Sequence, residues 1–227
     1  NEDTREAEAF YAGVTAVRRT DGSRARARDT GVTTLIGRRL VLRPLRANDF
    51  SAWREVRQRN VDWLTKWEPQ RVPGQPDTTR DRDAFLVRCS ARERERQLGT
   101  GYGFGIFVDG VFAGEINLNA VQRGPFQSAY VGYWIDERHA GQGYVPEAVV
   151  TLAKFVFEDL HLHRMQIAII PRNSASRRVV EKLGLRDEGI AVRYLEINGV
   201  WEDHVRSALT REEWVERREE LLRRWID

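Results

Sequence analysis

The sequence predicts an α/β fold in a single domain, built on a mixed sheet in which most neighbouring strands run antiparallel. Two β-prone stretches each contain a favoured hairpin turn, Asp109-Gly110 in the first and Asn198-Gly199 in the second. Between them, residues 128–170 read as strand, helix, strand, which gives one parallel crossover. A single crossover is too few for a doubly wound dinucleotide-binding domain.

Apolar periodicity and capping residues place the other elements in order along the chain. In the first half, we expect a strand over residues 35–45, a helix over 49–59, a loop with Trp63 and Trp67, a long helix capped by Asp77 or Thr78, and strands at 102–108 and 111–118. In the second half, we expect strands at 128–135 and 165–170, helices at 145–160 and 173–183, strands at 194–197 and 200–209, and a last helix after the capping box of Thr210 and Glu213.

Length and composition bound the possible functions. The chain has 227 residues, 41% hydrophobic and 31% charged, so its core needs no disulfide or structural metal. One cysteine and four histidines without metal-ligand spacing argue against any metal site. The net charge of +3 is too balanced for a sequence-specific nucleic-acid binder, and no apolar run approaches the roughly 18 residues of a membrane span. We therefore expect a cytoplasmic protein without a membrane partner.

Residues 1–34 differ in character from the rest and are expected to form an extension to a domain of residues 35–227. Phe10, Val14 and Val17 lie at helical spacing and predict a short helix. A turn-rich loop with several arginines follows over residues 21–28. Exposed arginines attract polyanions, so this loop either contacts RNA phosphates or is solvated surface.

Residues 130–147 carry the strongest chemical signal, because an aromatic strand leads through a turn into an amphipathic helix. Arg138, Gly141 and Gly143 form the pattern R-x-x-G-x-G, and Pro146 fits the first turn of a helix. Glycines let free backbone N–H groups approach a ligand at the positive end of the helix, where a diphosphate fits. The third glycine of a dinucleotide motif and the Lys-Ser/Thr pair of a P-loop are missing. A tight turn with no ligand is the alternative.

This loop, followed by a strand, Asn173 and a helix, resembles the GCN5-related N-acetyltransferase (GNAT) superfamily over about residues 35–214. Within it, the sequence is similar to the Rim-type ribosomal-protein alanine N-acetyltransferases, closest to the RimJ branch. That likeness is carried by residues 63–64, 66–69, 121–126, 163–164, 197–205 and 208–210. The resemblance implies the GNAT fold, a mixed and mostly antiparallel sheet of about seven strands with a splayed central parallel pair, flanked by helices.

The resemblance also implies acetyl-CoA as co-substrate. Backbone N–H groups of residues 138–143 would hold its pyrophosphate, and its pantetheine would lie beside the end of the strand that carries Trp134 and Ile135. The implied binding residues are Trp134, Ile135, Arg138, Gly141, Gln142, Gly143, Tyr144, Asn173, Ser176, Arg177 and Arg178. Asn173 either contacts the pantetheine, caps its helix, or does both.

The implied reaction is direct attack of a neutral amine on the thioester, which needs a proton acceptor and a donor to the departing thiolate. Many superfamily members carry that donor as a tyrosine seven residues after the asparagine, where this chain has Val180. We expect Ser176 to donate instead, the N–H of Ile135 to stabilise the oxyanion, and Glu115 to act as base if burial raises its pKa. Alternatively, Ser176 only helps to start its helix and Glu115 is a solvated strand residue.

On the acceptor side we expect Trp67, Glu68, Asn117 and Asn119, the last two sharing a strand face with Glu115. The resemblance implies that the acceptor is a protein N terminus, an alanine of a small-subunit ribosomal protein. With such a substrate, the basic run of the extension would be the segment that contacts the ribosome. The alternatives are a small amine, such as an antibiotic or polyamine, and a non-catalytic CoA-binding, ribosome-associated protein. A closed acidic pocket would favour a small polycation, and an open groove a peptide.

Overall fold

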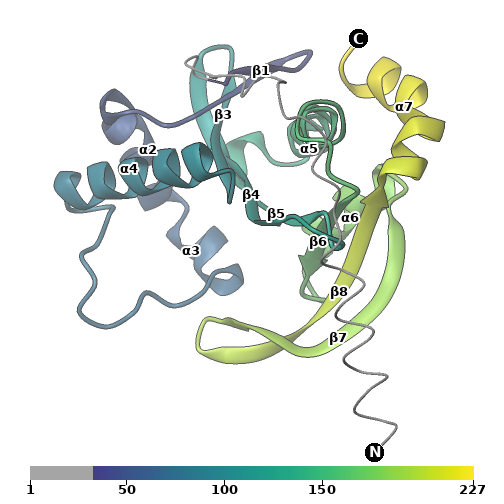
Figure 1. Cartoon of the computed structure of the whole chain (residues 1–227). Helices are drawn as coiled ribbons and strands as arrows, with labels where there is room; N and C mark the ends of the chain where they lie inside the picture. The colour runs from purple at the N-terminus through teal and green to yellow at the C-terminus, as the bar shows by residue number, and fades with distance from the viewer. Residues whose placement is uncertain (1–32) are drawn as a thin grey trace, which may run out of the picture. The chain divides into compact units, whose positions relative to one another are not determined.

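The computed structural model describes residues 33–227 and gives them the expected α/β architecture (Figure 1). Within this range, eight strands form one sheet in the order β1-β2-β3-β4-β5-β6-β8-β7. Neighbouring strands are antiparallel except β5 (Ser128–Ile135) and β6 (Arg164–Ile169), which form the expected parallel pair. The predicted early helix and basic loop lie outside the described residues, and the division at residues 34 and 35 stays a prediction.

Both hairpin predictions are confirmed. The remaining strands are β1 (Leu35–Ile36), β2 (Leu40–Arg43), β3 (Tyr102–Val108), β4 (Val111–Gln122), β7 (Arg186–Ile197) and β8 (Val200–Thr210). Asp109, Gly110, Asn198 and Gly199 all have positive φ, as the two central positions of this turn type require. The single strand expected over residues 35–45 is instead two short strands, because the N–H of Gly37 donates to the Leu40 carbonyl (2.9 Å) and closes a turn.

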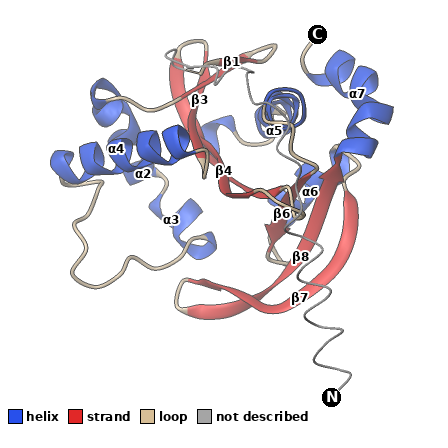
Figure 2. Cartoon of the chain, viewed as in Figure 1, coloured by secondary structure: helices blue, strands red, loops and turns tan. Residues whose placement is uncertain are grey.

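Helices cover both faces of the sheet (Figure 2). The helices are α2 (Phe50–Arg59), α3 (Val61–Leu64), α4 (Arg82–Leu98), α5 (Tyr144–Lys154), α6 (Ser174–Lys182) and α7 (Arg211–Trp225). The larger core lies between the sheet and α5, α6 and α7, and includes Ile116, Met165 and Trp214. A smaller core on the opposite face joins α2 and α4 to the sheet through Trp53 and Phe85. No helix of residues 33–227 has the length and apolarity needed to cross a membrane.

Some helix boundaries differ from the sequence prediction. The cap of α4 is Asp81, whose carboxylate accepts a hydrogen bond from the N–H of Asp83 (2.9 Å). Asp77 does not cap this helix, because its carboxylate already binds the N–H and hydroxyl of Thr79 (2.9 and 2.6 Å). The expected loop with the two tryptophans is helical, since α3 continues as a 3-10 turn over Thr65–Trp67.

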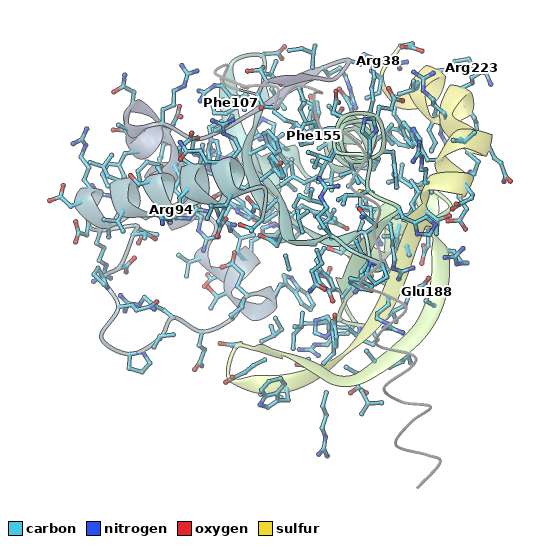
Figure 3. All side chains as sticks on the ribbon, viewed as in Figure 1. Arg38, Arg94, Phe107, Phe155, Glu188 and Arg223 are labelled. Atoms are coloured by element: carbon cyan, nitrogen blue, oxygen red, sulfur yellow. The ribbon has the colours of Figure 1, made fainter. Side chains whose placement is uncertain are left out.

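The turn between β1 and β2 fixes the position of α5. Glu147, in the first turns of α5 and 1% exposed, accepts hydrogen bonds from the backbone N–H (2.6 Å) and Nε (2.9 Å) of Arg39. The neighbouring Arg38 donates to the carbonyl of Arg223 in α7 (2.9 Å), and Figure 3 shows these two residues at the same end of the molecule. The start of α5 is thus tied to the edge of the sheet.

The predicted capping box at the start of α7 is present. The N–H of Thr210 donates to the Glu213 carboxylate (2.8 Å), and the N–H of Glu213 donates to the Thr210 hydroxyl (3.4 Å). Thr210→Ala removes that hydroxyl, so we expect the free energy of unfolding in urea to fall by about 1 kcal/mol. Thr210→Ser keeps the cap and is the control; an equal loss in both variants would assign the effect to the methyl group instead.

Candidate active site

The parallel strands β5 and β6 separate before either strand ends. Ser128, Ala129 and Tyr130 pair with residues 164–166, and in the described part of the chain the pairing stops there. On their outer sides both strands stay paired, β5 with β4 and β6 with β8. Residues 131–135 therefore present a backbone edge to the gap without a strand partner, and such an edge can hydrogen-bond an extended ligand.

Ile135 turns its backbone toward this gap. The N–H of the next residue, Asp136, donates to the carbonyl of Ala113 on β4 (2.7 Å). Successive residues of a strand direct their backbone groups to opposite edges, so the N–H and C=O of Ile135 face the gap. The indole Nε1 of Trp63 donates a hydrogen bond to that carbonyl (3.1 Å). The N–H of Ile135 still faces the gap.

The loop after β5 forms an anion cradle beside the gap. Gly141 and Gly143 have φ of 77° and 87°, a region that favours glycine, and a Cβ at Gly141 would meet no atom within 4 Å. The first hydrogen bond of α5 runs from the N–H of Glu147 to the Gly143 carbonyl (3.2 Å). The N–H groups of residues 144 and 145 thus have no partner within the helix, and the positive end of α5 favours an anion.

A pocket of about 570 Å³ fills the gap and connects the cradle to the residues after α2. The expected site residues that line it are Trp67, Glu68, Asn117, Trp134, Ile135, Gly141, Gly143, Tyr144, Asn173, Ser176 and Arg178. The expected site residues that do not line it are Glu115, Asn119, Arg138, Gln142 and Arg177. The glycine loop and the start of α6 therefore meet at one pocket, whereas most of the predicted acceptor face of β4 lies elsewhere.

Glu115 lies in the smaller core, outside the pocket. It is 2% exposed, and its two carboxylate oxygens accept hydrogen bonds from Trp53 Nε1 (2.6 Å) and the Arg88 guanidinium (2.5 Å). Contrary to expectation, this face of β4 is covered by α2 and α4 and does not open toward an acceptor groove. The geometry gives no support to Glu115 as general base, because both of its oxygens are engaged.

The two asparagines that follow on the same strand face have different environments. Asn119 accepts a hydrogen bond from Arg92 of α4 (3.0 Å), so it too lies under a helix. Asn117 lines the pocket, and its buried Oδ1 has no hydrogen-bond partner among the described residues. The oxygen lies over Gly103 of β3, where a Cβ would approach it to 3.0 Å, and not over Gly132 of β5. Asn117 thus borders the pocket while its Oδ1 is directed toward β3.

The start of α6 is held from two sides. Asn173 caps the helix through its Oδ1, which accepts from the N–H of Ser176 (3.1 Å), and both residues also line the pocket. The hydroxyl of Tyr133 on β5 donates to the Ser176 carbonyl (3.4 Å) across the gap. Burial raises the pKa of Tyr133 well above its usual range, so this hydroxyl remains a donor. These contacts fix where the Ser176 side chain begins.

The far end of the pocket is walled by an ion pair and by the β7–β8 hairpin. Arg57 binds both oxygens of the Glu68 carboxylate (2.6 and 2.7 Å), and the carbonyl of Glu68 accepts from the N–H of Asn198 in the hairpin turn (2.9 Å). Next to it, Arg172 pairs with Glu202 of β8 (2.6 Å). The hairpin is thereby anchored to the residues after α3.

The two predicted loop residues outside the pocket support its shape. The side-chain amide of Gln142 donates to the Arg138 carbonyl (2.8 Å), and the Gln142 carbonyl accepts from Arg39 (3.1 Å). On α6, Arg177 lies 3.8 Å from Glu181 and faces away, while Lys182 lines the pocket one turn after Arg178. The sequence placed both Arg177 and Arg178 at the cofactor, because helical spacing alone does not decide which of two adjacent arginines faces a ligand. Only Arg178 lines the pocket.

Several pocket residues were not assigned to the site from the sequence. They include Trp63, Lys66, Tyr133, His139, Arg172 and Lys182. Trp63 and Lys66 stand in a segment that carries the family resemblance, and Arg172 precedes the predicted Asn173, so these positions offered a signal. Across residues 33–227, no group of three or more His, Cys, Asp and Glu side chains could hold a metal ion.

Comparison with known proteins places this geometry in a family. The model of the acetyltransferase (GNAT) domain matches residues 39–186. The chain is 34% identical over 172 residues to a Bacillus subtilis protein named "Probable N-acetyltransferase YjcK", covering 75% of this chain and 93% of the relative. It is 31% identical over 180 residues to the [ribosomal protein uS5]-alanine N-acetyltransferase of Escherichia coli, covering 78% and 90%.

Among solved structures, the chain is similar to Mycobacterium smegmatis RimJ in complex with CoA-disulfide. The TM-score is 0.76 at 31% identity, over 85% of this chain and 93% of that one. The match to the family model spans the splayed parallel strands and the glycine loop described above, and the relatives align along most of the chain. The protein belongs to the GNAT family, with RimJ-like relatives, and is an acetyl-CoA-dependent N-acetyltransferase.

Proposed function

We propose that this enzyme acetylates the α-amine of a protein N terminus in the cytoplasm, with an N-terminal alanine of a small-subunit ribosomal protein as acceptor. The charge of the pocket carries this proposal. Glu68 supplies the one carboxylate among the lining residues, and Arg57 already binds both of its oxygens. The cationic lining side chains are Lys66, Arg172, Arg178 and Lys182. Arg178 and Lys182 would balance the phosphates of the donor, and Arg172 already binds Glu202 (2.6 Å), so the lack of a free carboxylate is what disfavours a polyamine or aminoglycoside. A peptide N terminus brings one charge, which it must lose to react.

The ribosomal acceptor is supported by the relatives. The Escherichia coli relative is named for the alanine of ribosomal protein uS5, and it matches 78% of this chain. Contact with the ribosome would bring the enzyme close to such an N terminus, and the basic run of residues 21–28 is the segment we propose for it.

The residues at the gap fit acetyl-CoA, which supplies the acetyl thioester when bound. The unpartnered edge of residues 131–135 suits the amides of a pantetheine arm. The cradle at Gly141 and Gly143 suits the pyrophosphate, and Arg178 and Lys182 provide positive charge for the phosphates. The relative from Mycobacterium smegmatis, solved with a CoA-disulfide, supports this use of the gap.

We assign the chemistry to groups that face the pocket. The N–H of Ile135 would stabilise the oxyanion that develops on the thioester carbonyl. The hydroxyl of Ser176 would donate to the departing thiolate. It would take the role of the tyrosine that many superfamily members carry at the position of Val180. On the acceptor side, Asn117, Trp67 and Glu68 would contact the substrate.

Mass spectrometry after incubation with acetyl-CoA tests the acceptor class. The panel contains equimolar peptides starting with alanine, the same peptides with a blocked α-amine and a free lysine, spermine and an aminoglycoside. We expect acetyl on the α-amine of the alanine peptides, because the pocket lacks an acidic wall for polycations. Product on spermine or the aminoglycoside alone would overturn the proposed acceptor but leave the family assignment intact.

The phosphate cradle is tested with Gly141→Glu. This change forces a side chain onto a position with φ of 77° and adds negative charge to the cradle, so we expect acetyl-CoA affinity to fall more than about 100-fold in calorimetry. Gly110→Glu is the matched control, because Gly110 has a similar φ of 80° in the distant β3–β4 turn and, like Gly141, open space around it. Equal binding by both variants would place the phosphates elsewhere.

The role of Ser176 is tested with Ser176→Ala. We expect kcat to fall about 10- to 100-fold, because the thiolate loses its hydrogen-bond donor, while the acetyl-CoA dissociation constant stays close to that of the wild type. Steady-state kinetics and calorimetry measure the two quantities. Ser174→Ala is the control, since Ser174 lines the same pocket at the start of the same helix. An unchanged kcat in Ser176→Ala would leave the serine with only its helix-start role.

A further inference from the structure

Asp136, at the end of β5, is a buried carboxylate surrounded by donors. It is 1% exposed and accepts hydrogen bonds from the guanidinium of Arg59 (2.5 Å), the side-chain amide of Asn60 (2.8 Å) and the N–H of Arg138 (3.4 Å). Burial alone would raise the pKa of Asp136, but these donors and the charge of Arg59 lower it to about 2. Asp136 is therefore ionised at any working pH, and its bonds to α2 persist.

Asn60 uses both ends of its side-chain amide at this point. It is 2% exposed; its Nδ2 donates to the Val56 carbonyl (2.8 Å) and to Asp136 (2.8 Å), and its Oδ1 accepts from the N–H of Glu137 (2.9 Å). An amide suits both roles, because a carboxylate here would face Asp136, and an apolar side chain would leave the N–H of Glu137 unpaired and remove one donor from Asp136.

The residues on either side of this contact belong to the two walls of the pocket. Asn60 precedes α3, and its carbonyl accepts the N–H of Leu64 (2.9 Å), so it also holds the helix that leads into the lining residues 63–68. Trp63 of α3 adds the hydrogen bond to Ile135 described above. Across the contact, Asp136 and Glu137 begin the loop that leads to the glycine cradle. The joint formed by Arg59, Asn60 and Asp136 thus connects the two walls.

We propose that Asn60 is a positioning residue for acetyl transfer, acting through this joint to set the distance between the acceptor amine and the thioester. The inference rests on the proposed function in that it places the acceptor against residues 63–68. Neither Asn60 nor Arg59 lines the pocket, so neither contributes binding contacts of its own. A displacement of about 1 Å between two reacting groups can reduce the rate about 100-fold while each substrate still binds.

Asn60→Ala tests the proposal through a split between rate and binding. We expect kcat, normalised to the number of acetyl-CoA sites counted by calorimetry, to fall about 100-fold, with the acetyl-CoA dissociation constant within about threefold of the wild type. A purely structural role would lower Tm and the number of sites but leave the rate per site unchanged. A rate per site within about threefold of the wild type would overturn the proposal.

Two further comparisons keep the test decisive. Leu162→Ala, at a fully buried residue away from the joint, should lower Tm without changing the rate per site. Should Asn60→Ala fail to fold, Arg59→Met removes another bond of the joint and Arg59→Lys keeps its charge. We expect the lysine variant to recover part of the rate that the methionine variant loses, and equal rates per site in the two would overturn the proposal.

The acceptor panel tests the proposed function separately from the role of Asn60. The rates are measured on whichever amine the wild-type enzyme acetylates in the acceptor panel. A wild type that acetylates only small polyamines refutes the peptide acceptor, and the Asn60 and Arg59 variants then test the joint on that amine.

Discussion

The separation of β5 from β6 after Tyr130 is the constraint on which the site depends. If the parallel pair continued, the backbone groups of residues 131–135 would form hydrogen bonds with β6 and no pocket would form. Gly114 makes the geometry at the end of β5 possible, because a Cβ there would lie 2.3 Å from the carbonyl oxygen of Trp134, so β4 can approach this closely only at a glycine. Tyr133 then spans the gap to Ser176. The glycine loop and the start of α6 are useful because they flank an edge that the sheet leaves open.

Two buried carboxylates, one within β4 and one directly after β5, hold α2 against the sheet. Glu115 binds Trp53 and Arg88, and Asp136 binds Arg59 and Asn60. Buried charges are costly unless fully hydrogen-bonded, and apolar packing in their place is often as stable. Their contribution is therefore better described as geometry than as stability: Glu115 fixes α2 and α4 on β4, and Asp136 fixes the end of α2 at the end of β5. Glu115 and Asp136 thus position helices through their hydrogen bonds.

The sequence predicted those parts of the site that depend on local backbone chemistry. Positive-φ turns, the glycine loop, and the caps at Asn173 and Thr210 follow from residue type and spacing within a few positions. The errors concern tertiary surroundings. Strand alternation placed Glu115 and Asn119 on one face, but it could not show that α2 and α4 cover that face. Likewise, Asp77 and Asp81 are both residues that commonly cap helices. The hydrogen bonds distinguish them, because Asp77 binds Thr79 whereas Asp81 accepts from the N–H of Asp83 at the start of α4.

A site whose carboxylates are engaged selects its acceptor by the acceptor's own pKa. Glu68 is bound by Arg57, and Glu115 lies outside the pocket, so under the proposed function the amine would arrive neutral or lose its proton to water. His139 packs against Tyr144, the first residue of α5. A peptide α-amine has a pKa near 8, whereas a lysine side chain has a pKa near 10.4, so at pH 7 the neutral fraction of the α-amine is larger by a factor of a few hundred. The absence of a free carboxylate among the lining residues thus favours an N-terminal acceptor over a lysine side chain, on grounds independent of pocket charge.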